Sequence, residues 1–233
     1  MPQWLADFAD RFYTNFIKED RWKFIADGLK VTIVVTFFAV IIGIVLGFII
    51  AVVRSTHDKT GKLKIADFIC KLYLTVIRGT PTVVQLLIIY FVVFGSVTVS
   101  KTVAAIIAFG INSGAYVAEV IRSGIMSIDK GQMEAGRSLG FNYAQTMIHI
   151  ILPQAFKNVL PALGNEVIVL LKETSVCGYI ALQDLTKGGD IIRSRTYDAF
   201  MPLFAVALIY LVIVMLLQRV VAGIERRLST SER

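Results

Sequence analysis

The sequence has little of what metal, redox or nucleotide chemistry requires. It contains two cysteines and two histidines, and neither histidine has cysteine or carboxylate partners at metal-site spacing. Cys70 and Cys177 lie in or beside apolar runs, too far apart in sequence to suggest a metal or redox pair, so we expect two small buried hydrophobes. No GxxxxGK[ST] phosphate loop occurs, because Thr56 stands where the glycine before Gly61 and Lys62 is needed. We therefore expect no catalytic residue, metal or cofactor in this chain, and any nucleotide must bind a different chain.

Charge is also scarce. Charged residues make up 18% of the chain and hydrophobic residues 56%, with a mean hydropathy of +0.70, whereas soluble domains are about 45–50% apolar. The net charge is +7, but Lys and Arg cluster at the ends of apolar segments, where lipid headgroups and orientation explain them. The composition predicts an all-α integral membrane protein with no nucleic-acid partner.

Five segments are long and apolar enough to cross a bilayer, which takes about 20 residues per helix. The predicted spans are residues 31–53, 67–94, 102–121, 155–176 and 200–221. The first carries no charge. The second contains RGTPT at 78–82, and in lipid such a glycine and proline interruption survives only where neighbouring helices or a water-filled cavity satisfy the backbone. The fourth is the most polar.

Basic residues orient the predicted spans. They are more frequent in the loops 54–66 and 122–147 and in the tail after 217 than in the segments of the other side, and the positive-inside rule assigns that side to the cytoplasm. We expect a multi-pass protein of a bacterial-type cell membrane, with its N-terminus outside and its C-terminus in the cytoplasm. The expected organisation is an amphipathic extracytoplasmic segment (1–27), a transmembrane domain (28–222) and a cytoplasmic tail (223–233).

Aromatic residues recur every four positions near the start of the chain, at Trp4, Phe8, Phe12 and Phe16, with charged residues between them. This period is typical of an amphipathic helix. Its apolar face could lie on the membrane surface, or it could pack on the protein's own outer face; the sequence does not choose between these.

Polar side chains inside the spans are the candidate solute contacts, since an ionisable group at bilayer depth costs at least about 2.5 kcal/mol. Glu166 could meet a cationic group of a solute, or it could form a salt bridge to Lys172, Arg78 or another helix. Glu119 is expected to pair with Arg122, three residues further along the helix. The remaining candidates for the solute path could equally hydrogen-bond a neighbouring helix; they are Asn165, Asn112, Tyr116, Gln85, Thr80 and Arg78.

Residues 134–156 read EAGRSLGFNYAQTMIHIILPQAF, a polar stretch between apolar segments. The pattern resembles the EAA loop of ABC importer permeases: E-A-A, three residues, G, nine residues, I-x-L-P. Gly136 is the one departure, because that family usually has alanine there. The resemblance implies that residues 128–146 form a cytoplasmic coupling helix that docks on a separate ATPase subunit. The residues expected to carry the coupling are Glu134, Ala135, Gly136, Leu139, Gly140, Leu152 and Pro153.

Local chemistry fits a docking role. Small residues at 135 and 136 would let a helix seat closely against a partner, and Gly140 would end or turn it. Glu134 could cap the first turn or pair with a basic residue of the partner. Pro153 is expected to separate the loop from the following span.

Other stretches extend the resemblance over residues 25–222. RGTP followed by Gln85, NSGAYVAEVIRSGI (112–125), NEVIVLLKETSV (165–176) and IALQDL (180–185) resemble the polar amino acid permeases that serve histidine, glutamine, arginine, cystine and related solutes. That resemblance implies the type I ABC importer permease fold with five transmembrane helices. It also implies a second permease copy or close homologue, two ABC ATPase subunits that hold ATP and Mg, and an extracytoplasmic amino-acid-binding protein that faces residues 178–199.

The function implied is a permease subunit that lies in membrane lipid and imports polar amino acids by alternating access. The carboxylate of Glu166 favours basic amino acids among them. The alternative is a secondary transporter or channel for a polar solute, which would also bury carboxylates and break helices but would not explain the loop pattern. A non-transporting membrane scaffold would use the loop for docking alone. An exporter is excluded only by the family resemblance.

Overall fold

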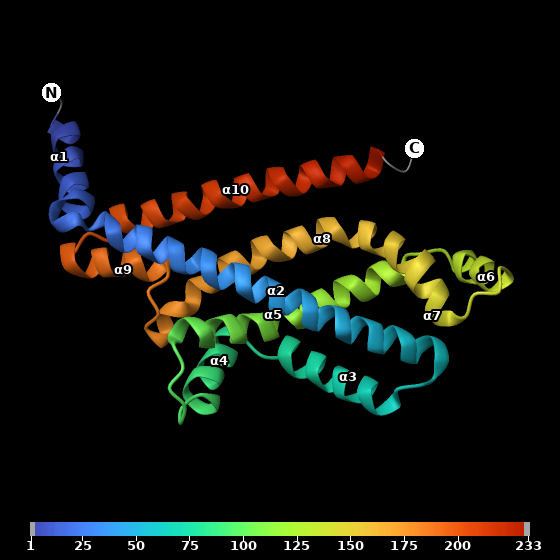
Figure 1. Ribbon diagram of the computed structural model, residues 1–233. Coiled ribbons are helices and arrows are strands. Elements are labelled where there is room, and N and C mark those ends of the chain that lie inside the picture. Colours follow the sequence, from blue (N-terminus) through green and yellow to red (C-terminus); the bar gives the residue numbers. More distant parts are fainter. Residues whose placement is uncertain (1–2, 231–233) are drawn as a thin grey trace. The chain divides into compact units, whose positions relative to one another are not determined.

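The computed structural model describes residues 3–230, and these residues form helices and connecting segments without a strand (Figure 1). The α-helices are α1 (Gln3–Phe12), α2 (Trp22–Thr60), α3 (Lys64–Arg78), α4 (Thr82–Leu87), α5 (Lys101–Met126), α6 (Lys130–Ser138), α7 (Tyr143–Thr146), α8 (Leu152–Glu173), α9 (Leu185–Thr196) and α10 (Phe200–Thr230). Short π- and 3-10-helical turns join some of them: η1 (Tyr13–Ile17), η2 (Lys18–Asp20), η3 (Ile88–Val93), η4 (Met147–Ile151) and η5 (Thr174–Ile180).

Among residues 3–230, three helices are long and apolar enough to cross a membrane: Trp22–Thr60, Lys101–Met126 and Phe200–Leu228. They correspond to the predicted spans 31–53, 102–121 and 200–221, and each extends beyond the predicted ends. Hydropathy marks the length in contact with lipid, whereas the backbone hydrogen bonds continue into the polar flanks.

The second predicted span is broken in two. Lys64–Arg78 and Thr82–Val93 meet at an angle of 108°. The break falls at RGTP, where the N–H of Gly79 still donates to the Thr75 carbonyl at 3.0 Å while Pro81 has no N–H to continue the helix. The predicted interruption is therefore confirmed as a sharp bend.

The fourth predicted span corresponds to α8. It is 22 residues long with Pro161 inside it, but it does not reach the apolarity of the other three. The count of five spans therefore stays a prediction.

The chain divides into two compact units made of alternating segments. The first contains residues up to 39, 82–109 and 169–216. Its core joins the start of α2, α9 and the start of α10 through Ile25, Leu185, Ile192, Met201 and Val206. A buried hydroxyl reinforces this core, because Thr32 accepts a hydrogen bond from the N–H of Leu185 at 3.1 Å.

The second unit contains residues 40–81, 110–168 and those from 217 onward. Its core packs the C-terminal halves of α2 and α5 against η4 and α8; the buried residues are Ala51, Val117, Ile121, Ile125, Met147, Ile151, Ala155, Val159 and Leu163. A smaller cluster joins α2, α3 and α5 through Ile50, Leu74, Ala115 and Ala118. This unit holds the loop 128–146 and most of the candidate solute contacts.

Candidate functional site

The loop 128–146 is mostly helical, because α6 and α7 make up most of it. Asp129 caps the N-terminus of α6, with its carboxylate accepting from the N–H of Gly131 at 2.7 Å. Glu134 lies in the second turn of α6 and is exposed, so the suggestion that it caps the first turn is wrong. The cap is provided instead by Asp129, five residues before Glu134.

Gly140 ends α6, as the sequence predicts. Its φ of +82° is in the left-handed region that favours glycine. Its N–H donates to the Arg137 carbonyl at 2.9 Å, and the N–H of Phe141 donates to the Gly136 carbonyl at 3.0 Å. These two bonds form a Schellman motif, which fixes the direction in which the chain leaves α6.

A capping box then starts α7. The Asn142 side chain accepts from the N–H of Gln145, and the Gln145 side chain accepts from the N–H of Asn142, each at 2.9 Å. Hydrogen bonds thus cap both ends of α6 and the start of α7. In Figure 1, α6 and α7 lie beyond the C-terminal end of α5.

Gly136 faces the protein's own interior. It is buried, and a Cβ atom built on it would lie 2.5 Å from Cγ2 and 2.8 Å from Oγ1 of Thr146. The expectation that both small residues face a partner is therefore wrong for Gly136, whose lack of a side chain lets α6 approach α7 and η4. Ala135 is exposed, so it remains available at the surface.

Pro153 does not separate the loop from the following helix, contrary to the prediction. Helical structure is continuous from Tyr143 through η4 to Glu173. The π-helical turn before Pro153 closes with the N–H of Leu152 donating to the Met147 carbonyl, and such turns absorb an irregular residue within a helix. Leu152 is half-buried and packs against the core, while Pro153 is exposed.

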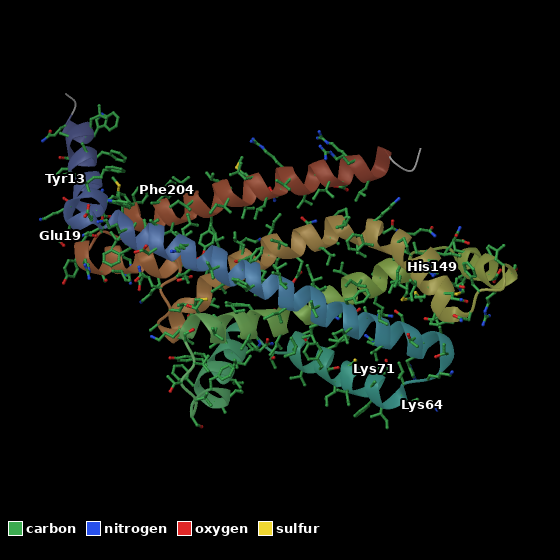
Figure 2. All side chains as sticks on the ribbon, in the orientation of Figure 1. Tyr13, Glu19, Lys64, Lys71, His149 and Phe204 are labelled. Carbon is green, nitrogen blue, oxygen red and sulfur yellow. The ribbon has the colours of Figure 1, made fainter. Side chains whose placement is uncertain are left out.

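The outer surface of the loop therefore carries Glu134, Ala135 and Leu139. Leu139 is 74% exposed, an unusual position for a leucine next to two polar helices. In η4, His149, which is labelled in Figure 2, lies with its ring centroid 6.3 Å from that of Phe141. An apolar side chain flanked by charge on a rigid support has the chemistry of a protein-docking surface.

A cluster of ion pairs lies between α2, α3 and α5 in the second unit. The expected pair is present, with Arg122 Nη2 3.6 Å from Glu119 Oε2. A second pair, with Arg54, was not predicted from the sequence. Arg54 Nη1 lies 3.0 Å from Glu119 Oε1, and the Arg54 side chain is only 15% exposed. Arg78 Nη1 is 3.7 Å from the same oxygen. The structure thus pairs Arg78 with Glu119, on which three guanidinium groups converge.

Asp67 extends this cluster and was also missed. Its carboxylate, which is 4% exposed, is 3.6 Å from Arg54 Nε, 2.7 Å from Lys71 Nζ and 3.4 Å from His57 Nδ1. Lys71, labelled in Figure 2, lies on α3 one turn after Asp67. A charged residue one turn before a lysine is the sequence signal that could have indicated the local pair, but nothing in the spacing connects Asp67 to Arg54.

Glu166 lies half-buried near the middle of α8. It accepts a hydrogen bond from the Ser113 hydroxyl of α5 at 3.4 Å. Asn112, the neighbour of Ser113, is buried, whereas Asn165 is exposed. The structure therefore brings Glu166 together with α5, and it adds Ser113 to the predicted set.

Arg78, Tyr116 and Thr80 lie near the RGTP break. The Arg78 guanidinium sits 5.8 Å from the ring centroid of Tyr116, within range of a cation–π interaction. The Thr80 hydroxyl donates to the Val76 carbonyl at 2.8 Å. Gln85 is buried on α4, which belongs to the first unit.

Comparison with known proteins assigns this chain to a family. Helices apolar enough to cross a membrane, with ion pairs and a polar loop beside them, fit an integral membrane protein. The model of the family described as "Binding-protein-dependent transport system inner membrane component" matches residues 43–230, and the chain belongs to this family.

Relatives and a solved structure agree with that assignment. The chain is 40% identical over 210 residues to the "Putative glutamine transport system permease protein GlnP" of Rickettsia bellii (strain RML369-C), covering 89% of this chain and 94% of the relative. It is 38% identical over 211 residues to the "Arginine transport system permease protein ArtQ" of Bacillus subtilis (strain 168), covering 90% and 94%. The structure titled "Crystal structure of an amino acid ABC transporter with histidines" superposes with a TM-score of 0.82 at 42% identity, covering 91% of this chain and 98% of that one. The predicted family and the all-α importer-permease fold are confirmed.

Proposed function

We propose that this chain is the permease subunit of an ATP-driven importer of polar amino acids, and that it moves its solute by alternating access. The relatives named for glutamine and arginine transport, and the structure titled for an amino acid transporter with histidines, support this cargo class. The observation that carries the proposal is the rigid loop with exposed Glu134, Ala135 and Leu139, because a membrane subunit without its own phosphate loop needs a surface on which an ATPase can act.

The loop is well placed to transmit movement. α6 is held against α7 and η4 by the close approach at Gly136 and by the Schellman turn at Gly140. The helical run from Tyr143 continues to Glu173 and carries Glu166. Since packed helices move as stiff bodies, a displacement of α6 by an ATPase would be passed along this run to the span that bears the candidate solute contact.

Glu166 and Asn165 are the proposed contacts for the solute, with Ser113 beside them. A carboxylate in a span would attract the ammonium group of an amino acid or a basic side chain, and it would favour basic solutes over neutral ones. Residues around the bend would shape the rest of the path; the proposed members are Arg78, Thr80, Gln85, Asn112 and Tyr116. Among these residues, Arg78 forms an ion pair with Glu119.

The partners follow from the same proposal. The chain itself would not be an enzyme; ATP and Mg would be held by two ABC ATPase subunits, and a second permease copy or close homologue would complete the path. An extracytoplasmic binding protein would deliver the amino acid to residues 178–199. The N-terminus would lie outside, with the tail after 222 in the cytoplasm.

Docking is tested by charge reversal. The permease carrying Glu134→Lys is co-expressed with its ATPase, and the complex is isolated through a tag on the permease. We expect ATPase recovery to fall strongly, because the charge at the docking surface is reversed. Glu225→Lys is the matched control, since Glu225 is also exposed but lies on α10. Equal ATPase recovery from both variants would contradict the docking assignment.

The cargo is tested in proteoliposomes with the ATPase and the binding protein. Glu166→Gln should weaken the stimulation of ATP hydrolysis by a basic amino acid more than the stimulation by glutamine. Unchanged stimulation by both would make Glu166 a structural residue. Uptake driven by a proton gradient without ATPase would instead support a secondary transporter.

A further inference from the structure

The apolar face of α1 is not covered by the described part of the chain. Trp4, Phe8 and Phe12 are 68%, 53% and 46% exposed, and none of the α1 residues is buried. Their spacing of four places them on one face of the helix. Of the predicted aromatic face, only Phe16, beyond the end of α1, packs in the protein's own core, and that packing does not extend to Trp4, Phe8 and Phe12.

α1 is nevertheless held firmly at its C-terminal end. Arg11 forms a two-bond pair with Asp198, with Nε 3.0 Å from Oδ2 and Nη2 2.8 Å from Oδ1. The Asn15 amide donates to Asp198 Oδ2 at 2.9 Å and accepts from the Thr196 hydroxyl at 2.8 Å. We call Arg11, Asn15, Thr196 and Asp198 the latch. It joins α1 to the segment between α9 and α10, so α1 is positioned relative to the first unit.

The direction of α1 is that of a helix in the membrane plane. In Figure 1, α1 runs across the direction of α2 and α10, both of which are apolar enough to span a membrane. The turn between α1 and α2 is fixed by a positive φ of 56° at Glu19 and at Asp20; Glu19 is labelled in Figure 2. A helix that crosses the spans at their ends lies along the bilayer surface.

Aromatic side chains continue this face onto the adjoining spans. At the start of α2, Trp22 is 48% exposed, and at the start of α10, Phe200 and Phe204 are 61% and 54% exposed. The rings of Phe200 and Phe204 stack with centroids 5.3 Å apart. Exposed aromatic rings at the ends of spans are typical of the interface between lipid headgroups and acyl chains. The uncovered face of α1 is thus continuous with a lipid-facing belt.

The few charged residues of α1 indicate whether it needs anionic lipid. Its only charged residues are Asp7, Asp10 and Arg11, and Arg11 is already paired with Asp198. Helices that require anionic lipids carry an excess of Lys and Arg on their polar face. α1 has no such excess of basic residues, so its attraction to a membrane must come from burial of its aromatic residues.

We propose that α1 binds the surface of the lipid bilayer through Trp4, Phe8 and Phe12, without a requirement for anionic lipid, and that the latch holds residues 196–200 at the depth set by α1. This interaction is independent of the cargo and of ATPase docking, so it can fail while the proposed function stands.

Trp4 reports on this contact directly. The chain has two tryptophans, so Trp22→Phe leaves Trp4 as its single fluorescent indole. The full chain is reconstituted in phosphatidylcholine vesicles that carry bromine atoms at different depths of the acyl chains. We expect blue-shifted Trp4 emission that is quenched most by bromines near the headgroups, and equally so when anionic phosphatidylglycerol is added.

Three results would overturn the proposal. Water-like emission without quenching would place α1 in solvent. Blue-shifted emission without bromine quenching would mean that a protein surface, such as a second copy of the chain, covers it. Quenching that appears only with phosphatidylglycerol would contradict the absence of an anionic-lipid requirement.

The latch is tested with a spin label at Tyr197→Cys, next to Asp198 and 94% exposed in the native protein. Cys70 and Cys177 are replaced by serine and alanine respectively, in every sample compared. Asp198→Ala should raise the mobility of the label above its mobility in the chain with the native latch, because the backbone beside it loses the contacts of Asp198, while Trp4 quenching persists. Asp190→Ala is the matched control, because Asp190 pairs with Lys187 and Arg193 inside α9 and not with α1. Equal mobility in the two variants would overturn the role of the latch.

Discussion

Replacement of Gly136 by alanine tests the packing that holds the loop. A Cβ atom at this position would lie 2.5 Å from Thr146 Cγ2, 2.8 Å from Thr146 Oγ1 and 3.2 Å from Ile150 Cδ1. Carbon atoms in contact normally lie about 3.5–4.0 Å apart, so α6 must move away from α7 by about 1 Å. Thr146 cannot easily turn aside, because it is fully buried and its hydroxyl donates to the Asn142 carbonyl at 3.0 Å.

Two opposing terms set the magnitude. Alanine is favoured over glycine in a helix by about 1 kcal/mol, whereas an extra methyl group in a well-packed site costs about 1–3 kcal/mol. The net loss is then about 0–2 kcal/mol. If about 1 kcal/mol of it falls on docking, the affinity for the ATPase should drop about fivefold.

The assay is a titration of the purified ATPase against the reconstituted permease, together with ATP hydrolysis stimulated by the binding protein. Thr146→Ala removes both atoms of Thr146 that the new methyl group would meet, so the double variant should recover most of the affinity lost by Gly136→Ala. Gly223→Ala is the control for helix propensity, because a Cβ atom there has nothing within 4 Å. It should bind ATPase normally.

The reasoning would be refuted if Gly136→Ala bound the ATPase more tightly than the native chain. It would also be refuted if the effects of Gly136→Ala and Thr146→Ala were simply additive, because residues in contact should show a coupling energy of at least about 0.5 kcal/mol.

Three further predictions concern charged groups. Arg54→Gln should lower the free energy of unfolding by about 1.5–3 kcal/mol, because Glu119 loses its 3.0 Å hydrogen bond to a charged group while Asp67 keeps Lys71 and Glu119 keeps Arg122; a detergent melting curve unchanged from the native one would contradict this. The Arg11 hydrogen bond holds the pKa of Asp198 below its ordinary value, so the latch should stay closed at the pH of about 3.9 at which an ordinary aspartate is half protonated and should open only at lower pH, where the mobility of the label rises. Burial raises the pKa of Asp184 to about 6, which disfavours its ionised form in the fold. The unfolding temperature should therefore rise as pH falls from about 6 to about 4, and Asp184→Asn, which keeps an N-cap oxygen for α9, should melt higher than the native chain at neutral pH.

The spans were the most predictable part of the fold because lipid imposes one requirement on every residue in contact with it. The charge-free run in 31–53 predicts a helix whatever its neighbours are. Hydropathy could not set the ends of that helix, since α2 begins at Trp22 and runs to Thr60, outside the apolar stretch. The composition of α8 did not decide the role of its polar residues, because a polar residue in a span can face a solute path or bond to a neighbouring helix.

The loop was predicted in outline by the spacing of its glycines and its proline. The caps themselves carry short signals that could have been found, since Asn142 followed by Gln145 has the spacing of a capping box. The roles of Glu134 and Pro153 were wrong because a single residue type has several uses: an acid can cap a helix or lie on its surface, and a proline can end a helix or follow a π-helical turn. Only the neighbouring hydrogen bonds decide between them.

The ion-pair cluster lay beyond the reach of sequence spacing. Glu119 and Arg122 are three residues apart and were paired correctly, but Arg54 reaches Glu119 across 65 positions of the chain. Such a contact depends on how α2 and α5 pack, and in one sequence nothing marks two distant charges as partners. The consequence for the candidate site is direct: Arg78, expected as a possible partner of Glu166, is held instead at Glu119.

The glycine that departs from the EAA pattern is best understood together with Thr146. A small side chain at the third position of the pattern needs space on the facing helix, and in this chain Thr146 fills that space with atoms 2.5 and 2.8 Å from where a methyl group would stand. Glycine at 136 and threonine at 146 are therefore alternatives to alanine at 136 and a smaller residue at 146. Glu134, Ala135 and Leu139 remain exposed beside this packing, so the departure at Gly136 does not weaken the docking role proposed for them.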